Sequence, residues 1–304
     1  MKYTAGRENG RRRPRGYADW RPHAATSVLL DQVNAILDEY ATYLPLTVRQ
    51  IFYRLVGKYG YEKTENAYGR LAEHLVRARR ARLIPFDWIR DDGISYYPVN
   101  WFSGVQNFHE ETARRARQYR RDRLAGQEFE IELWTEAAGM APQLAYIAHD
   151  YSIPVYSSGG FLSLTAVRSI AERGVAFSVP LVILHVGDFD PSGVAIFDSI
   201  AADAAAFVEA DRHVATSRII AERVALTVEQ VETYSLPTAP PKTSDSRSKG
   251  WTETCQLEAL APDVLADIVR EEILEWIDVD VLQDVLEQER ADRAELLGLP
   301  RGGA

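Results

Sequence analysis

Short apolar runs alternate with amphipathic stretches over the second half of the chain, from residue 128 to residue 226. The runs have the length of strands, and the stretches between them repeat apolar residues at helical spacing. Such alternation with short connections is typical of a mostly parallel sheet with helices on both faces. We therefore predict an α/β fold here, with strands over residues 129–136, 153–160, 179–190 and 217–226.

The first half has a different pattern, in which apolar residues recur at helical spacing three times between residues 26 and 95. Thr47 is suited to cap the start of the second helix, and Gly60 is suited to end it. The third helix is basic, with Arg70, Arg77, Arg79, Arg80 and Arg82, and a short strand or wing is expected after it. Three short helices with a basic last one are typical of a helix-turn-helix or winged-helix domain. An ordinary solvated face gives the same basic pattern.

The remaining segments complete the organisation. Residues 109–126 predict one helix that carries six arginines, and the chain beyond residue 251 predicts two acidic amphipathic helices. The predicted parts are a basic flexible arm over 1–25, a winged-helix domain over 26–95, a basic linker helix over 96–127, the α/β domain over 128–250 and acidic helices over 251–304.

Charge is distributed unevenly along a chain whose net charge is −9. Residues 1–125 hold 23 Lys and Arg against 14 Asp and Glu, a net of +9. Residues 126–250 hold 8 against 16, and residues 251–304 hold 4 against 14. A basic front on an acidic body favours a polyanion such as nucleic acid as the partner of the front, although solvated surfaces also segregate charge.

The rest of the composition bears on the cellular compartment of the protein. The single cysteine, Cys255, excludes an internal disulfide framework and a multi-cysteine metal site, and it fits a reducing cytoplasm. No apolar run approaches the roughly 18 residues that a membrane span needs. The arginine-rich N-terminus lacks the apolar core of a secretory signal. We therefore expect a cytoplasmic protein with no membrane partner.

Carboxylates follow two of the predicted strands at their carboxyl ends. Glu136 ends one strand, and Asp188 and Asp190 follow another in the stretch HVGDFDPSG. Ligands of open α/β sheets bind at such strand ends, and three oxygen donors suit Mg²⁺ or Mn²⁺. The glycines Gly159 and Gly160 end a third strand. Turn residues or helix caps are the alternative explanation of the two aspartates.

These motifs together resemble a known family. The segment ELWTE, the glycines of YSSGG and the stretch GDFDPSG are similar to the Toprim domain of topoisomerases, primases and nucleases. The form with Pro191 and Gly193 resembles most the topoisomerase VI A subunit and its meiotic double-strand-break relatives. VRQIFYRL, with Arg49, Phe52 and Tyr53, resembles the winged-helix signature of the same family. The resemblance covers roughly residues 30–235, in the family's domain order.

The resemblance implies a Mg²⁺-dependent DNA transesterase that works as a homodimer on double-stranded DNA. Tyr53 would be the nucleophile that forms a 5′-phosphotyrosyl link, Arg49 would steady the phosphate, and Glu136, Asp188 and Asp190 would hold the metal. The pattern around Tyr53 also fits an aromatic residue packed on the core face of its helix. Candidate DNA contacts are Arg77, Arg79, Arg80, Arg114 and Arg117.

The chain also departs from the family. It contains no GHKL ATPase, so strand passage cannot be assigned to it alone, and a separate ATPase B-like subunit stays an open possibility. It is similar to small stand-alone A-like proteins of bacterial mobile elements. Two other functions stay open: a hydrolytic Toprim nuclease, and a non-catalytic DNA-binding subunit of a larger assembly. The sequence assigns no role to Lys242, Arg247, Cys255 or Glu258.

Overall fold

The computed structural model describes residues 17–90, 101–157, 164–212, 218–241 and 247–298. The chain divides into two compact units, Met1–Asp91 and Asp92–Ala304. Most of the predicted basic arm lies outside the described residues.

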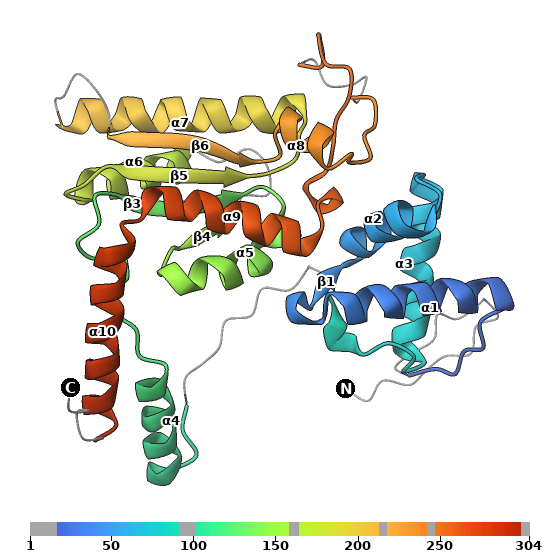
Figure 1. The fold of residues 1–304 in the computed structure, drawn as a ribbon, viewed down its shortest axis with the longest axis horizontal. Helices are drawn as coiled ribbons and strands as arrows, with labels where there is room; N and C mark the ends of the chain where they lie inside the picture. The colour runs from blue at the N-terminus through green and yellow to red at the C-terminus, as the bar shows by residue number, and fades with distance from the viewer. Residues whose placement is uncertain (1–16, 91–100, 158–163, 213–217, 242–246, 299–304) are drawn as a thin grey trace, which may run out of the picture. The chain divides into compact units, whose positions relative to one another are not determined.

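The first unit is built mainly from three helices, as its apolar spacing predicts (Figure 1). Its elements are α1 (Ala24–Glu39), η1 (Ala41–Tyr43), β1 (Leu46–Thr47), α2 (Val48–Tyr59), α3 (Glu65–Arg80), η2 (Phe86–Trp88) and β2 (Ile89–Arg90). The strand expected after the third helix is only two residues long, and it pairs in parallel with β1. The three predicted helices are therefore confirmed.

Local chemistry sets both ends of α2. The Thr47 hydroxyl accepts a hydrogen bond from the Gln50 backbone N–H at 3.1 Å, and the Gln50 side chain accepts one from the Thr47 N–H at 2.9 Å. This reciprocal capping satisfies two backbone donors near the start of the helix. At the other end Gly60 has φ 65°, a left-handed conformation that is cheap only without a Cβ. Both predicted ends are confirmed.

The second unit contains a four-stranded sheet whose neighbouring strands are all parallel. The strands are β3 (Glu130–Thr135), β4 (Val155–Ser157), β5 (Leu181–Val186) and β6 (Ile219–Ala225). Their order in the sheet is β4, β3, β5, β6, so the chain places β4 on one side of β3 and then returns to build on the other side. The predicted α/β class is confirmed.

Helices cover both faces of this sheet (Figure 1). They are α6 (Leu164–Ala176) and α7 (Pro191–Arg212) on one face, and α5 (Ala141–Ala148) and α9 (Pro262–Trp276) on the other. Because side chains alternate along a strand, Leu181 and Ile183 of β5 face α6 and α7. There they join an apolar cluster with Trp134 and Phe197. The two helical layers thus bury β5 from both sides, and each of its residues is buried.

The basic linker is only partly helical. Helix α4 (Val105–Arg117) ends nine residues before the predicted end at residue 126. Beyond it, Arg121 pairs with Asp292 at 2.6 Å and Arg123 pairs with Glu289 at 2.8 Å, both on α10 (Val279–Leu296). The prediction of one helix over residues 109–126 is therefore wrong. The ion pairs with α10 hold the residues after Arg117 in a non-helical conformation.

Short helical turns complete the second unit: η3 (Ala138–Met140) and η4 (His149–Tyr151) flank α5, and η5 (Leu257–Ala259) precedes α9.

The polar segment after β6 contains one short helix, α8 (Val228–Thr233), and then returns to the sheet. An antiparallel bridge joins Phe189 to Cys255, so the chain ahead of α9 passes beside the end of β5. The two acidic helices predicted beyond residue 251 are confirmed as α9 and α10. Within the described ranges, no helix combines the length and the apolar character needed to cross a membrane.

Candidate active site at the ends of β3 and β5

The sheet brings the carboxyl ends of β3 and β5 side by side. Thr135, the last residue of β3, is the register partner of Val186, the last residue of β5. Glu136 follows Thr135 and Gly187 follows Val186, so the two segments leave the sheet at the same edge. The strand order also changes direction here: after β3 the chain adds β4 on one side, and then adds β5 and β6 on the other. Such switch points leave a crevice at the strand ends, where α/β proteins bind their ligands.

The Glu136 side chain packs against the turn that follows β5. Its Oε1 atom accepts a hydrogen bond from the Asp188 backbone N–H at 3.2 Å. A Cβ on Gly193 would lie 2.5 Å from the same oxygen, and a Cβ on Gly187 would lie 2.8 Å from it. Real Cβ atoms essentially never come this close. Glycine at both positions therefore allows the carboxylate to approach the backbone.

The two aspartates have different local partners. Asp190 Oδ1 accepts a hydrogen bond from the Gly193 N–H at 2.6 Å, which makes Asp190 the N-cap of α7. Asp188 Oδ1 accepts one from the Leu257 N–H at 2.9 Å and so ties the chain at η5 to this edge of the sheet. The helix-cap explanation is thus correct for Asp190. A carboxylate has a second oxygen, so capping does not exclude metal binding.

A half-buried arginine that the sequence analysis missed lies beside these carboxylates. Arg223 of β6 donates from Nη2 to the carbonyl oxygens of Gly187 and Asp188, from Nε to that of Leu226 at 3.0 Å, and approaches His185 Nδ1 at 3.3 Å. Because guanidinium only donates, His185 Nδ1 is the acceptor and the ring proton sits on Nε2. The signal for it was an arginine within the strand predicted over residues 217–226. The motif itself contains no basic residue, and β6 supplies one from elsewhere in the chain.

The electrostatics of this edge follow from burial and crowding of charge. Burial, with the like charges of Asp188 and Asp190 added, raises the pKa of Glu136, and Arg223 opposes part of that rise. Burial lowers the pKa of Arg223, against the pull of the three carboxylates. Burial and the Arg223 charge lower the pKa of His185 to about 3, so this ring is neutral. One arginine against three acids leaves an excess of negative charge here.

The donor chemistry of this edge fits a hard divalent ion. Mg²⁺ and Mn²⁺ prefer oxygen ligands, and Mg²⁺ keeps several waters in addition to one or two carboxylates. Among the described residues, however, no group of three or more His, Cys, Asp or Glu side chains is arranged to hold a metal. Each of the three acids instead accepts a hydrogen bond from a backbone N–H. The residues match the ion in chemistry and lie at one edge of the sheet, but the acids would have to reorient to bind it together.

Tyr53 lies on α2 of the first unit and is almost buried, with 6% of its surface exposed. Its ring meets the Phe52 ring edge-on at 5.4 Å, and Lys63 Nζ lies 5.8 Å from its centroid. Arg49 stands one turn earlier on the same helix face, over the Tyr68 ring at 5.3 Å. Tyr53 therefore packs as a core aromatic residue with two cationic side chains nearby.

The predicted DNA-contacting arginines differ in exposure. Arg77, Arg114 and Arg117 are exposed and Arg80 is half-buried. Arg79 is only 5% exposed, its Nε donates to the Leu75 carbonyl oxygen, and its guanidinium lies 5.7 Å from the Phe86 centroid. This burial removes Arg79 from the surface that a phosphate can reach.

Several other predicted positions have a simple outcome. Gly159, Gly160 and Lys242 lie outside the described residues. Glu258 follows Leu257, whose backbone N–H donates to Asp188, so the segment that carries Glu258 lies at the same edge of the sheet.

A scan against protein-family models found no match to the chain, and a search of the curated proteins found no significant match.

Proposed function

We propose that the protein cleaves DNA with the help of a divalent metal held at the ends of β3 and β5, in the manner of a topoisomerase VI A-like transesterase. The observation that supports this most is the packing of Glu136 against the turn from Asp188 to Gly193. It brings three carboxylates to one edge of a parallel sheet, and the order and spacing of these acids along the sequence resemble those of a Toprim domain. The basic first 125 residues supply the charge that a DNA partner needs.

In this proposal Mg²⁺ or Mn²⁺, when bound, stabilises charge on the phosphate and on the leaving oxygen. Glu136, Asp188 and Asp190 hold it. Burial and the neighbouring aspartates raise the pKa of Glu136, and a bound cation would lower it again. Arg223 keeps this edge in place through hydrogen bonds to three backbone carbonyl oxygens.

Tyr53 is the proposed nucleophile. Its hydroxyl oxygen bonds to phosphorus, the bond from phosphorus to the 3′ oxygen breaks, and that oxygen takes up a proton while the phenol loses one. The products are a 5′-phosphotyrosyl link and a free 3′-hydroxyl. Lys63 places positive charge near the Tyr53 ring, and Arg49 lies one turn earlier on α2, which favours an approaching phosphate. Because Tyr53 is nearly buried, this step requires its hydroxyl to become accessible when DNA binds.

The same burial favours a second candidate, a hydrolytic nuclease in which Tyr53 is structural and water attacks the phosphate. A homodimer, a separate ATPase partner and a cytoplasmic setting are proposals that accompany the first candidate. In the related family, tyrosine and metal come from different protomers.

A denaturing gel that detects covalent protein–DNA adducts separates the candidates. The protein is incubated with supercoiled DNA and Mg²⁺ or Mn²⁺, and Tyr53→Phe is compared with Tyr61→Phe. Tyr61 is a good control because its hydroxyl only donates to the Ala67 carbonyl oxygen, at 3.1 Å. We expect an adduct with the native protein and Tyr61→Phe, and none with Tyr53→Phe.

The carboxylates are tested by Asp190→Asn, which removes charge but keeps a residue that caps helices well. Asp203→Asn, on the exposed face of α7, is its control. We expect Asp190→Asn to lower cleavage by about 100-fold or more, since even outer partners of a metal site contribute 10- to 100-fold. Cleavage that survives Tyr53→Phe but not Asp190→Asn would instead establish the hydrolytic nuclease. Salt-sensitive DNA binding without any cleavage would establish a non-catalytic subunit.

A further inference from the structure

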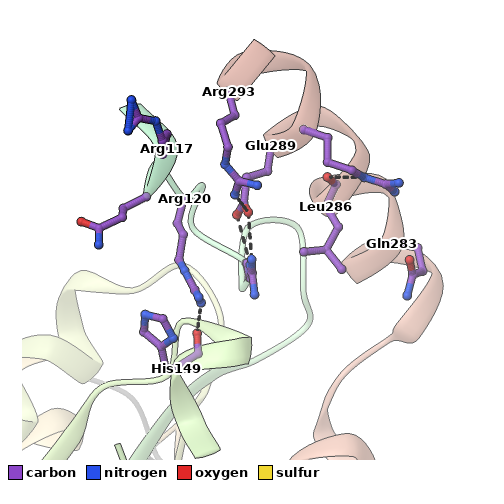
Figure 2. Close-up of a pocket in the computed structure, with 10 residues that line it drawn as sticks. Arg117, Arg120, His149, Gln283, Leu286, Glu289 and Arg293 are labelled. Atoms are coloured by element: carbon purple, nitrogen blue, oxygen red, sulfur yellow. Dashed lines mark hydrogen bonds and ion pairs between the residues drawn. The ribbon is translucent and has the colours of Figure 1, made fainter. Parts of the chain in front are cut away.

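A second polar site lies in the sheet-containing unit, away from the strand ends. The end of α4, the segment after it, η4 and α10 line a cavity of about 910 Å³ that is open to solvent (Figure 2). Its lining carries five arginines: Arg117, Arg120, Arg123, Arg290 and Arg293. The volume falls in the range of about 300–1,000 Å³ that is usual for small-molecule sites.

One carboxylate in this lining is already neutralised. Glu289 is 2% exposed and accepts hydrogen bonds from Arg123 Nη2 at 2.8 Å and from Arg293 Nη2 at 2.5 Å. The Arg121 N–H donates to its other oxygen at 3.1 Å. These bonds lower the pKa of Glu289, chiefly through Arg123. The network fastens α10 to the linker and leaves Glu289 little capacity to balance the other arginines.

The remaining arginines lack a strong counter-charge. Arg120 donates from Nη1 to the His149 carbonyl oxygen, a neutral acceptor (Figure 2). Arg290 comes no closer than 3.9 Å to Glu287, in a pair that solvent screens. The Arg117 side chain makes no hydrogen bond or ion pair with any residue that the structure describes. Three guanidinium groups thus face one cavity with weak compensation.

This arrangement is unfavourable for the protein alone. Burial lowers the pKa of Arg120, and the charges of Arg123 and Arg293 lower it further, while the charges of Asp150 and Glu289 oppose part of that fall. A guanidinium stays charged at any physiological pH, so it cannot relieve the repulsion by losing its proton. An anion in the cavity would relieve it. The planar fork of arginine matches the oxygens of a phosphate group in two parallel hydrogen bonds.

We propose that this cavity binds a ligand with two or more phosphate groups, held by Arg117, Arg120 and Arg290. His149 and Gln283 on the rim offer further hydrogen-bonding groups to the rest of the ligand (Figure 2). The phosphates can belong to a nucleoside polyphosphate or to adjacent positions of a DNA strand. The site is separate from the carboxylates at the sheet edge and does not depend on cleavage by them.

The test measures binding of tripolyphosphate, ATP and a fluorescent DNA duplex, without divalent metal and at fixed ionic strength. Arg117→Gln and Arg120→Gln are compared with Arg270→Gln, whose side chain pairs with Asp267 on α9 and does not line the cavity. Arg117 is exposed, so its variant is expected to fold normally, and circular dichroism checks both. Arg123 and Arg293 are left intact because they hold Glu289.

We expect each cavity variant to weaken tripolyphosphate binding by about 10- to 100-fold, the value of one charge-assisted hydrogen bond, while Arg270→Gln binds like the native protein. Tighter binding of ATP than of tripolyphosphate would identify a nucleotide as the ligand. A loss confined to the duplex would identify the DNA backbone. If none of the three probes distinguishes the cavity variants from Arg270→Gln, the proposal is wrong.

Discussion

Replacing Gly193 by alanine tests the close packing that defines the candidate site. The new Cβ would lie 2.5 Å from Glu136 Oε1, and 3.3 Å from the Asp188 carbonyl oxygen and from Asp190 Oδ1. Ordinary contact begins at 3.4 Å. The carboxylate must therefore retreat by about 0.9 Å, the difference between 3.4 Å and 2.5 Å, or the first turn of α7 must shift.

The two consequences differ in size. Overpacking usually costs about 1–3 kcal/mol of unfolding free energy, and the lower end applies here because the obstructing atom ends a flexible side chain. Alanine in a helix returns up to about 1 kcal/mol relative to glycine. We expect a net loss of about 0–2 kcal/mol. A displacement near 1 Å at a reacting site can cost about 100-fold in rate, so function should suffer far more than stability.

Urea unfolding with and without Mn²⁺, together with the cleavage assay, checks this prediction. Gly174→Ala is the matched control, because its Cβ would meet Val208 and Ile219 at 3.4–3.5 Å, which is ordinary contact. We expect Gly174→Ala to keep both cleavage and stabilisation by Mn²⁺, and Gly193→Ala to lose both while still folding. Equal behaviour of the two variants in every measurement would refute the packing of Glu136 against α7.

Three further predictions concern stability. Thr47→Ala should lower the free energy of unfolding of the first unit by about 1–2 kcal/mol in urea, because it removes the capping box of α2. Glu289→Gln should cost about 3 kcal/mol at pH 7, since it leaves Arg123 and Arg293 without a counter-charge. Because the folded-state pKa of Glu289 is depressed, that difference should shrink as the pH falls through 4.5 and below, and a constant difference would contradict the ion pairs. His185 has a folded-state pKa of about 3 against 6.5 in the unfolded chain, so only the unfolded state binds its proton between these values. Native stability should therefore fall relative to His185→Gln by about 1.4 kcal/mol per pH unit below 6.5, and parallel pH profiles of unfolding would show that the ring is not buried as a neutral group.

Local patterns were enough to predict the elements of the fold. The ends of α2 at Thr47 and Gly60 depend on contacts within one turn, which a sequence displays directly. The strands of the sheet and their parallel direction follow from apolar runs separated by helices. The position of Glu136, Asp188 and Asp190 at strand ends follows from the same pattern, because each acid comes within four residues of the end of such a run.

Contacts between distant segments could not be predicted from local sequence patterns. Arg223 reaches the acids only because β6 is the neighbour of β5, and Arg121 and Arg123 leave the helical path only because α10 offers Asp292 and Glu289. The burial of Tyr53 and Arg79 likewise depends on what packs over their helices. The spacing of apolar residues reports the conformation of a few adjacent residues. The partner of a charged side chain instead depends on how distant segments pack together in the folded chain.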